Sequence, residues 1–477
     1  MSHFKHHTTW TLLPVLIFFW LPTFAQITWS EPNEIASTSF GNTRPRIAAN
    51  RNGEALVIWG KSSDLYFSKS SPEGFTTPIK LNPAGVTVAS ATWMGPDIAA
   101  HGDTLYIVYK QTPEDLATSH IWCLRSTDGG NTFDPPVRVE DTGTDRTRFP
   151  AVTTDDEGHP IIAYMRFNPS FLDARWVVTR SYDYGQTFTP DVLASGWSGA
   201  DAEACDCCPG TIVCSGNNVA VIYRDNNESL RDSWAGFSTD GGITFSGGAN
   251  IDQNNWMINA CPSTGPDGVI LGDTLYSTFM NGQSGQALVY YNQTSIPDLY
   301  NPPSTAVPGF GVGLQQNFSR MASSGEAVAL VWRHSVNFST GLALMFTEDI
   351  HAGFLPVFDT VAFSQVANGD VAVTPNDVFV VWQNNSPATV MVRKGNYKAS
   401  TGIEDVVDPN PFLQLGITPN PAFEEITIDG PVALTRILDS AGRIMITSQE
   451  KMINIQSLPP GWYLVSSVYG IGKFVKY

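Results

Sequence analysis

Residues 126–133 read STDGGNTF, and two close variants of this phrase follow, SYDYGQTF at residues 181–188 and STDGGITF at residues 238–245. The copies recur every 55 to 57 residues, and a degraded copy at residues 70–77 precedes them by a similar interval. A sequence period of this length indicates one structural unit that is repeated along the chain.

The phrase has the chemistry of a β-hairpin turn. Its aspartate can fold a carboxylate back onto N–H groups of the turn, its second glycine can adopt a positive φ, and its closing phenylalanine can fill the gap beside the hairpin. We therefore expect structural roles for Asp128, Asp183 and Asp240. A repeat of this length that contains a hairpin has the size of a four-stranded blade, so the sequence predicts a β-propeller.

The blades can be counted a second time from apolar runs that end in an aromatic residue, which mark the second strand of each blade. Six runs are clear and one, at residues 274–279, is weaker; their aromatics are Trp59, Tyr109, Tyr164, Tyr223, Phe279, Trp332 and Trp382. We expect an all-β fold with a six- to seven-bladed propeller, seven favoured, over residues 26–397. Residues 27–34 would supply the fourth strand of the last blade and close the ring.

The repeated phrase resembles the Asp-box, or bacterial neuraminidase (BNR) repeat, of the sialidase-like propellers. In that family the motif marks the fold and lies away from the active centre, so the resemblance does not by itself imply an activity. Catalytic domains of the family usually have six blades, so seven would be a departure. The family uses an arginine triad for the substrate carboxylate, a tyrosine nucleophile activated by a glutamate, and an aspartic acid that protonates the leaving group.

Only part of this catalytic set has counterparts here. By position in their blades, Arg44 or Arg46, and Arg224, match two members of the arginine triad. Where the glutamate is expected the chain has Cys208, and Glu203 lies only nearby.

The place of the tyrosine nucleophile is also changed. It holds Phe318, whose phenyl ring cannot act as a nucleophile. Asp64, in the outer loop of the first blade, is a candidate for the acid. The resemblance thus leaves Asp64 and Glu203 as catalytic candidates, and any activity would be that of an exo-sialidase type glycoside hydrolase.

The N-terminus has the features of a secretory signal peptide over residues 1–25. Lys5 precedes an apolar stretch at residues 12–20, and a small-residue cleavage signal ends at Ala25. An N-terminal membrane anchor is the alternative. No later run approaches about 18 uninterrupted apolar residues, so we expect no transmembrane segment in the mature chain.

The repeats stop after Tyr397. Residues 398–412 form a linker rich in Pro, Asp, Asn and Gly, and residues 413–477 are predicted to form a small β-sandwich of short strands. Phrases such as ITPNPA at residues 417–422 and LPPGWYLV at residues 458–465 resemble the C-terminal (Por) sorting domain of the type IX secretion system of Bacteroidetes. This implies handling by the type IX secretion machinery and a secreted or cell-surface protein. A generic β-sandwich binding module is the alternative.

The chain is acidic, with 27 basic and 45 acidic residues and a formal net charge of −18. Such a surface repels nucleic acid and anionic membranes at long range. Against this background, nine basic residues fall near one predicted mouth of the propeller, namely Arg44, Arg46, Lys110, Arg146, Arg148, Arg166, Arg224, Arg320 and Arg333.

A ring of guanidinium groups would bind a carboxylate or sulfate through paired hydrogen bonds. We take Arg44, Arg46, Arg148, Arg166, Arg224 and Arg333 as the anion- or glycan-binding candidates. The alternative is that each arginine pairs with a neighbouring acid such as Asp97, Asp225 or Asp232 and stiffens a loop.

Six cysteines in an exported chain indicate disulfides, and the candidates are Cys205, Cys207, Cys208, Cys214 and Cys261. Cys208-Pro209 and Cys261-Pro262 occupy the same predicted register in consecutive blades, which favours a bond between Cys208 and Cys261 and leaves the other pairings open. A metal site on residues 205–208 is the less favoured alternative. No cofactor is expected, although a structural cation is possible.

These observations predict an exported propeller that recognises, and in one interpretation hydrolyses, an acidic glycan or glycoprotein. Its functional edge is expected at residues 201–232, where cysteines and paired charges are densest. The main alternative is a non-catalytic adhesion or scaffold propeller that binds a protein partner. A third is a hydrolase or lyase for acidic polysaccharide with a different set of residues.

Overall fold

The structure is a computed structural model that describes residues 27–36, 41–199, 201–309, 311, 313–336, 339–363, 365–386, 388–398, 415–429, 435–439, 444–467 and 470–477. The predicted signal peptide and all of the predicted linker after Lys398 lie outside these residues. In the described part the chain is all-β, with a single 3-10 turn, η1 (Ile350–Ala352). No helix there is long and apolar enough to cross a membrane.

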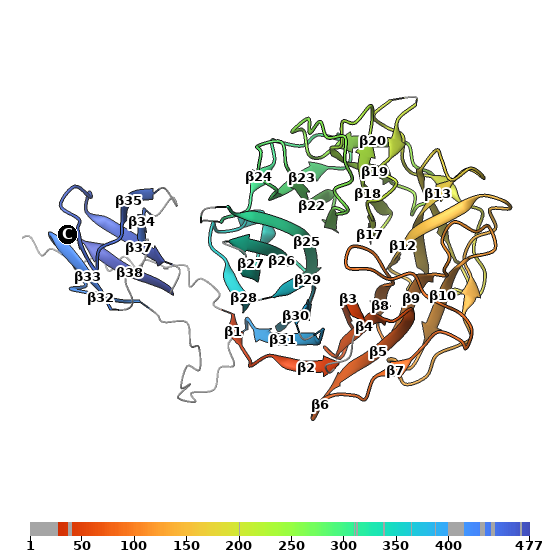
Figure 1. The fold of residues 1–477 in the computed structure, drawn as a ribbon, viewed down its shortest axis with the longest axis horizontal. Coiled ribbons are helices and arrows are strands. Elements are labelled where there is room, and N and C mark those ends of the chain that lie inside the picture. The colour runs from red at the N-terminus through yellow and green to blue at the C-terminus, as the bar shows by residue number, and fades with distance from the viewer. Residues whose placement is uncertain are drawn as a thin grey trace, which may run out of the picture.

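Seven antiparallel sheets of the described residues follow one another around a ring (Figure 1). The first four are built from β3 (Asn42–Ala49), β4 (Ala55–Lys61), β5 (Asp64–Ser71), β6 (Gly74–Phe75) and β7 (Ile79–Lys80); β8 (Asp97–His101), β9 (Thr104–Lys110), β10 (Ile121–Ser126) and β11 (Val137–Arg138); β12 (Arg146–Thr154), β13 (Pro160–Phe167), β14 (Arg175–Arg180) and β15 (Val192–Leu193); and β16 (Glu203–Ala204), β17 (Thr211–Ser215), β18 (Asn218–Asn226), β19 (Ser233–Ser238) and β20 (Gly247–Asn250).

The other three sheets complete the ring. They are built from β21 (Asp267–Leu271), β22 (Thr274–Asn281), β23 (Leu288–Ser295) and β24 (Thr305–Ala306); β25 (Gln315–Ser324), β26 (Ala327–Val336), β27 (Ser339–Thr347) and β28 (Asp359–Phe363); and β29 (Val366–Val373), β30 (Asp377–Asn384) and β31 (Val390–Asn396) with β1 (Thr28–Trp29) and β2 (Asn33–Ala36).

The ring is closed at two levels. The innermost strands β3, β8, β12, β17, β21, β25 and β29 contact one another in chain order, and β29 contacts β3. At the rim, β1 and β2 pair with β31, so the N-terminal residues complete the last sheet as the sequence predicts. Pairing from a distant part of the chain covers the edge that β31 would otherwise expose.

The second strand of each sheet is buried on both faces, which explains its nearly continuous apolar sequence. In β4, β9 and β18 the five residues up to and including the closing aromatic are all buried. The aromatics fill the space between neighbouring sheets: Trp59, for example, packs in one cluster with Val57 and with Phe379 and Val381 of the last sheet. The core of the ring therefore lies between the sheets.

The Asp-box turns are braced by hydrogen bonds within the motif. Asp128 accepts from the backbone N–H groups of Asn131 (3.0 Å) and Thr132 (2.9 Å), and from the Thr132 hydroxyl (2.7 Å). The equivalent bonds to Asp183 and Asp240 measure 2.6–3.0 Å. The second glycine has φ 81° in the first copy, where a Cβ would lie 2.5 Å from Phe67 Cζ. Glycine is thus required at Gly130 for its φ and for the close approach of the preceding sheet.

The C-terminal residues form two small sheets around a core of their own. One contains β32 (Gly416–Thr418), β33 (Glu425–Asp429) and β36 (Met452–Asn454), and the other contains β34 (Thr435–Leu438), β35 (Ile444–Ser448), β37 (Gly461–Ser467) and β38 (Gly470–Lys476). Apolar side chains of both sheets, including Ile426, Ile437 and Phe474, pack in a single cluster.

Candidate functional site

One register position recurs in all seven innermost strands. In each sheet, this position on the innermost strand pairs with the residue of the second strand that comes just before the buried aromatic. In chain order it is occupied by Arg46, Asp97, Ala151, Thr211, Asp267, Arg320 and Asp370. Five of these residues are charged. The innermost strands surround the centre of the ring (Figure 1). These five charged positions, which are far apart in the sequence, therefore lie around that centre.

The five charged residues form a continuous charge network, which we define as Asp97, Arg46, Asp370, Arg320 and Asp267. Oδ1 of Asp370 lies 3.6 Å from Arg46 Nη1 and 3.3 Å from Arg320 Nε. The network continues from Arg46 to Asp97 at 3.6 Å and from Arg320 to Asp267 at 3.3 Å. No side chain of the five is more than 14% exposed.

The carboxylates of the charge network also tie each sheet to the next. Asp97 accepts the backbone N–H of Val152 at 3.1 Å, across the boundary between β8 and β12. Asp267 accepts from Met321 N at 2.9 Å, and Asp370 accepts from Ile47 N at 3.1 Å. The network therefore holds the ring together, and its two arginines are already paired with carboxylates.

Arg44 differs from Arg46, although the two lie in the same strand. It occupies a β-bulge with φ 47°, where the register between β3 and β4 shifts. Among the described residues no carboxylate lies within ion-pair distance of its guanidinium, and its buried Nε has no hydrogen-bond partner. Burial lowers the pKa of Arg44 well below its usual value, and the positive charges of Arg46 and Arg320 lower this pKa further. An anion placed beside Arg44 would relieve this unfavourable environment.

Arg44 lines a small central hollow at the starts of the innermost strands, with about 20 Å³ of free space, which is room for little more than one water molecule. The hollow is defined by Arg44, Pro45, Arg46, Trp93, Pro209, Gly210, Thr264, Gly265, Pro266, Phe318, Ser319, Arg320, Asn368 and Gly369. These described lining residues include three guanidinium groups and two aromatic rings, but no carboxylate and no phenol. The hydroxyl of Ser319 is buried there and lacks a hydrogen-bond partner in the described structure.

The other anion-binding candidates are not among the residues that line this hollow. Arg148 contacts Glu114 through two hydrogen bonds of 3.2 Å, and its guanidinium lies 4.5 Å from the ring centre of Phe149. Arg166 donates to Asp145 at 2.7 Å and to Asp191 at 3.0 Å. Arg148 and Arg166 therefore each pair with a neighbouring acid, as the alternative interpretation expects. The acids are not the expected Asp97, Asp225 and Asp232.

Arg224 and Arg333 donate to backbone carbonyls. The fully buried Arg224 donates to the carbonyls of Arg231 and Met280, each at 2.6 Å. Arg333 donates to Val366 O at 3.0 Å. These contacts link strands and loops, so of the six candidates only Arg44 and Arg46 line the hollow.

The two catalytic candidates are not among the residues that line the hollow. Asp64 accepts from Lys80 at 2.8 Å and from Asn82 at 2.9 Å, and Lys80 followed by Asn82 lowers its pKa. A general acid requires the opposite shift. Glu203 lies in β16, opposite Asn226 of β18.

The disulfide differs from the expected one, because Cys261 is bonded to Cys207 and not to Cys208. The expectation aligned Pro262 with Pro209, but β21 begins only after Pro266, and Asp267 is the counterpart of Thr211. Cys261 therefore lies earlier in its loop than the alignment assumed. Within the described residues Cys123, Cys205, Cys208 and Cys214 are free thiols.

The acids of the segment 201–232 are held by polar contacts, some of them to the loop that follows β20. Asp232 accepts backbone N–H groups from Trp256 at 2.9 Å and Asn255 at 3.1 Å. Burial raises the pKa of Asp225 to about 6. Neither acid pairs with a predicted anion-binding arginine in the described structure.

Sequence reasoning missed Trp93 and the pairing roles of Asp267 and Asp370. Aligning the seven innermost strands on the aromatics of the second strands would have placed both aspartates in register with Arg46. Trp93 lies in the loop before β8, outside any repeated pattern, so no sequence signal indicated it.

Comparisons with known proteins give distant likenesses only. No family model and no curated protein matches the chain. A solved structure of a protein of unknown function from Dyadobacter fermentans is 12% identical, with a TM-score of 0.47, and the match covers 78% of this chain and 99% of that chain. An α-L-arabinanase from Penicillium chrysogenum complexed with arabinobiose is 13% identical, with a TM-score of 0.43 and coverages of 78% and 99%.

A sialidase from Trypanosoma rangeli in complex with the inhibitor DANA is also similar. It is 9% identical, with a TM-score of 0.45, and the match covers 76% of this chain and 59% of that chain. At such low identities no substrate or reaction can be transferred to this chain.

Proposed function

We propose that the seven sheets are the blades of a seven-bladed propeller, and that its central hollow binds the carboxylate of an acidic glycan. The observation that carries this proposal is Arg44, a guanidinium that lines the hollow with a buried, unpartnered Nε. A bound carboxylate would accept two parallel hydrogen bonds from this guanidinium, and the low local dielectric would strengthen them.

The remaining lining residues suit a sugar. Trp93 and Phe318 offer aromatic surfaces for the apolar face of a pyranose ring, while the Ser319 hydroxyl offers a partner for a sugar oxygen. The negative charge of the protein as a whole repels acidic ligands at long range, and Arg46 and Arg320 are already paired with aspartates, so Arg44 must supply the attraction locally.

Binding without hydrolysis fits this set of residues best. Glycoside hydrolases generally need a pair of carboxylates, or in sialidases a tyrosine nucleophile, beside the scissile bond. The described residues that line the hollow provide neither, and Phe318 replaces the expected tyrosine. We therefore propose a glycan-binding module, in which Arg44 has the main recognition role.

Replacing Arg44 with alanine is expected to weaken binding of sialylated or uronate-containing glycans by about tenfold or more, since a hydrogen bond to a charged group contributes about 1.5–3 kcal/mol. The measurement is calorimetric titration or a glycan array with the purified full chain. Wild-type binding should weaken as salt is added, and neutral glycans should not bind.

Arg51→Ala is the matched control, because it removes the same charge from a side chain that is 66% exposed and contacts Asp103. Unchanged affinity in Arg44→Ala would refute the proposed site. Release of free sialic acid would show an enzyme instead of a binding module. If no glycan binds, a protein partner becomes the next hypothesis.

We also propose that residues 1–25 are a signal peptide and that residues 413–477 are a sorting domain for type IX secretion, so that the protein is secreted or displayed at the cell surface. The separate core of the C-terminal unit supports its removal without damage to the ring. In a bacterium with this secretion system, the extracellular form should lack both segments by mass spectrometry, and deleting residues 413–477 should keep the protein inside the cell. An extracellular form that retains the tail would contradict this proposal.

A further inference from the structure

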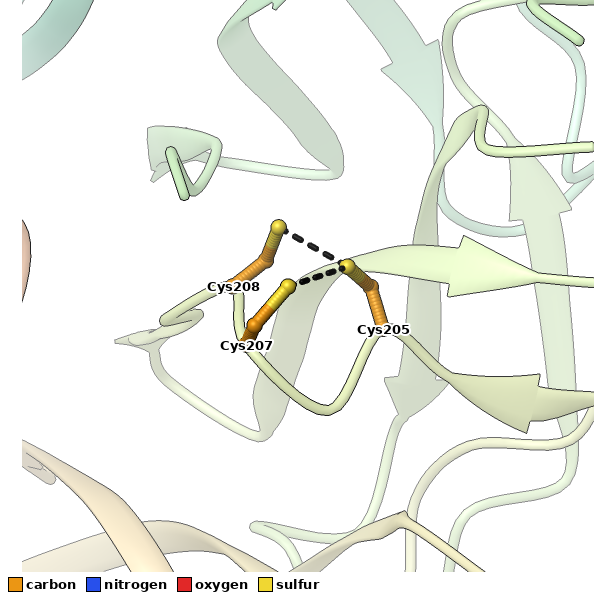
Figure 2. A group of neighbouring side chains, drawn as sticks. All are labelled: Cys205, Cys207 and Cys208. Atoms are coloured by element: carbon orange, nitrogen blue, oxygen red, sulfur yellow. Dashed lines mark hydrogen bonds between the residues drawn. The ribbon is translucent and has the colours of Figure 1, made fainter. Parts of the chain in front are cut away.

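Four cysteines are gathered beside the central hollow. Cys207 is bonded to Cys261, and the free Cys205 Sγ lies 2.9 Å from Cys208 Sγ and 3.5 Å from Cys207 Sγ (Figure 2). Nη1 of Arg231 lies 2.8 Å from Cys205 Sγ. A thiol is therefore in contact with a second thiol, a disulfide and a guanidinium at the same time.

We propose that Cys205 and Cys208 form a dithiol couple that exchanges with the Cys207–Cys261 disulfide. In the first step the Cys205 thiolate attacks Cys207 Sγ, so that a Cys205–Cys207 bond forms and Cys261 leaves as a thiolate. In the second step the Cys208 thiolate attacks Cys205 Sγ, which forms a Cys205–Cys208 bond and releases Cys207. Two thiols and one disulfide are present before and after, and the two protons lost by the couple pass to Cys207 and Cys261.

The groups around the two thiols favour Cys205 as the attacking nucleophile. The hydrogen bond between Cys205 and Cys208 lowers the pKa of Cys205 to about 7 against the effect of burial, and the charges of Arg231 and Arg224 act in the same direction. Burial raises the pKa of Cys208, which suits a thiol that acts second. A thiolate is the attacking species in disulfide exchange, and cationic neighbours favour it.

The sequence spacing agrees with this geometry. Cys205 and Cys208 are separated by two residues, which is the spacing of dithiol motifs that alternate between thiol and disulfide. Three sulfurs this close are also compatible with a soft metal ion. The guanidinium in contact with Cys205 and the engagement of Cys207 in a disulfide favour exchange.

Exchange would alter the wall of the hollow. The Cys207–Cys261 bond ties the loop before β17 to the loop before β21, and the same two loops supply Gly210 and Gly265 to the lining. A Cys205–Cys208 bond lies within one loop and leaves the other untied, with Cys261 as an exposed thiol. The pairing of the cysteines therefore determines whether the loops before β17 and β21, which both line the hollow, are covalently joined.

The proposal is tested on the full chain, purified and held without oxygen, by labelling free thiols with a maleimide and mapping tryptic peptides. Cys261 lies in the tryptic peptide 232–320, and the other three cysteines of the cluster lie in peptide 181–224. In the wild type we expect a fraction of Cys261 to be labelled and a Cys205–Cys208 link in the same fraction. In Cys208→Ser the second step is blocked, so a Cys205–Cys207 link and labelled Cys261 should accumulate.

Two further variants separate exchange from damage to the fold. Cys205→Ser should keep Cys207 linked to Cys261 and leave Cys261 unlabelled, whereas Cys214→Ser, which changes a thiol outside the cluster, should behave as the wild type. The proposal is overturned if Cys261 stays linked to Cys207 in both the wild type and Cys208→Ser. It is also overturned if every chain holds both disulfides at once, or if elemental analysis finds one metal ion per chain held by the four thiols.

Discussion

Asp370→Asn is expected to lower the free energy of unfolding by about 3–5 kcal/mol, the range found when one partner of a buried ion pair is removed. Asp370 serves Arg46 and Arg320 together, and it also accepts the N–H of Ile47. Asparagine has nearly the same volume, so the change removes charge without opening a cavity. Two buried guanidinium groups would then share only Asp97 and Asp267.

The loss is measured by urea unfolding of the full chain, followed by intrinsic tryptophan fluorescence, since several tryptophans are buried between the sheets. Asp103→Asn is the control, because Asp103 pairs with the exposed Arg51 and the variant should unfold at the same urea concentration as the wild type. An equally small effect in both variants would mean that the charge network does not hold the ring together.

Gly265→Ala is expected to lower the free energy of unfolding by about 1–3 kcal/mol, the typical range for overpacking, and to weaken the proposed glycan binding as well. A Cβ at this position would lie 1.9 Å from Pro209 O and 2.7 Å from Pro209 C. Backbone atoms cannot move aside by rotating a bond, so the loops before β17 and β21 would have to separate. Both residues line the hollow, which links the stability loss to a change in the shape of the site.

Gly199→Ala is the matched control for this substitution. The nearest atom to a Cβ there is Asn227 Nδ2 at 3.4 Å, an ordinary contact, so stability should change by less than about 0.5 kcal/mol. The measurements are the urea unfolding midpoint and the affinity for an acidic glycan. A Gly265→Ala protein with the midpoint and affinity of the wild type would contradict the close approach of the two loops.

The parts of the fold that were predictable depend on interactions within a few residues. Asp128 bonds to Ser126, Asn131 and Thr132, all inside the repeated phrase, so the phrase alone carries the turn. The second strands are buried on both faces, so each one is a nearly continuous apolar run in the sequence. The aromatic residues that end these runs recur at a regular spacing. The pairing of β1 and β2 with β31 was also predictable, because the last sheet lacked a strand.

The disulfide illustrates where this reasoning ends. Sequence composition identifies the five candidate cysteines, but the choice between Cys207 and Cys208 depends on where β21 begins. The loop contains two prolines, Pro262 and Pro266, and only Pro266 directly precedes the strand. A shift of a few residues in a loop changes which sulfur faces Cys261.

The repeat, the turn chemistry, the all-β class and the set of residues able to bind an anion or form a disulfide follow from the sequence alone. Which of these residues act together depends on the folded arrangement of the sheets. Arg44 and Arg46 are two residues apart and equal in chemistry, yet Arg46 is neutralised by aspartates of the two neighbouring sheets, the second and the last, while Arg44, at a bulge, lines the hollow. The reason is that turns are held by local hydrogen bonds, whereas the pairing of buried charges depends on partners that closure of the ring brings from other sheets.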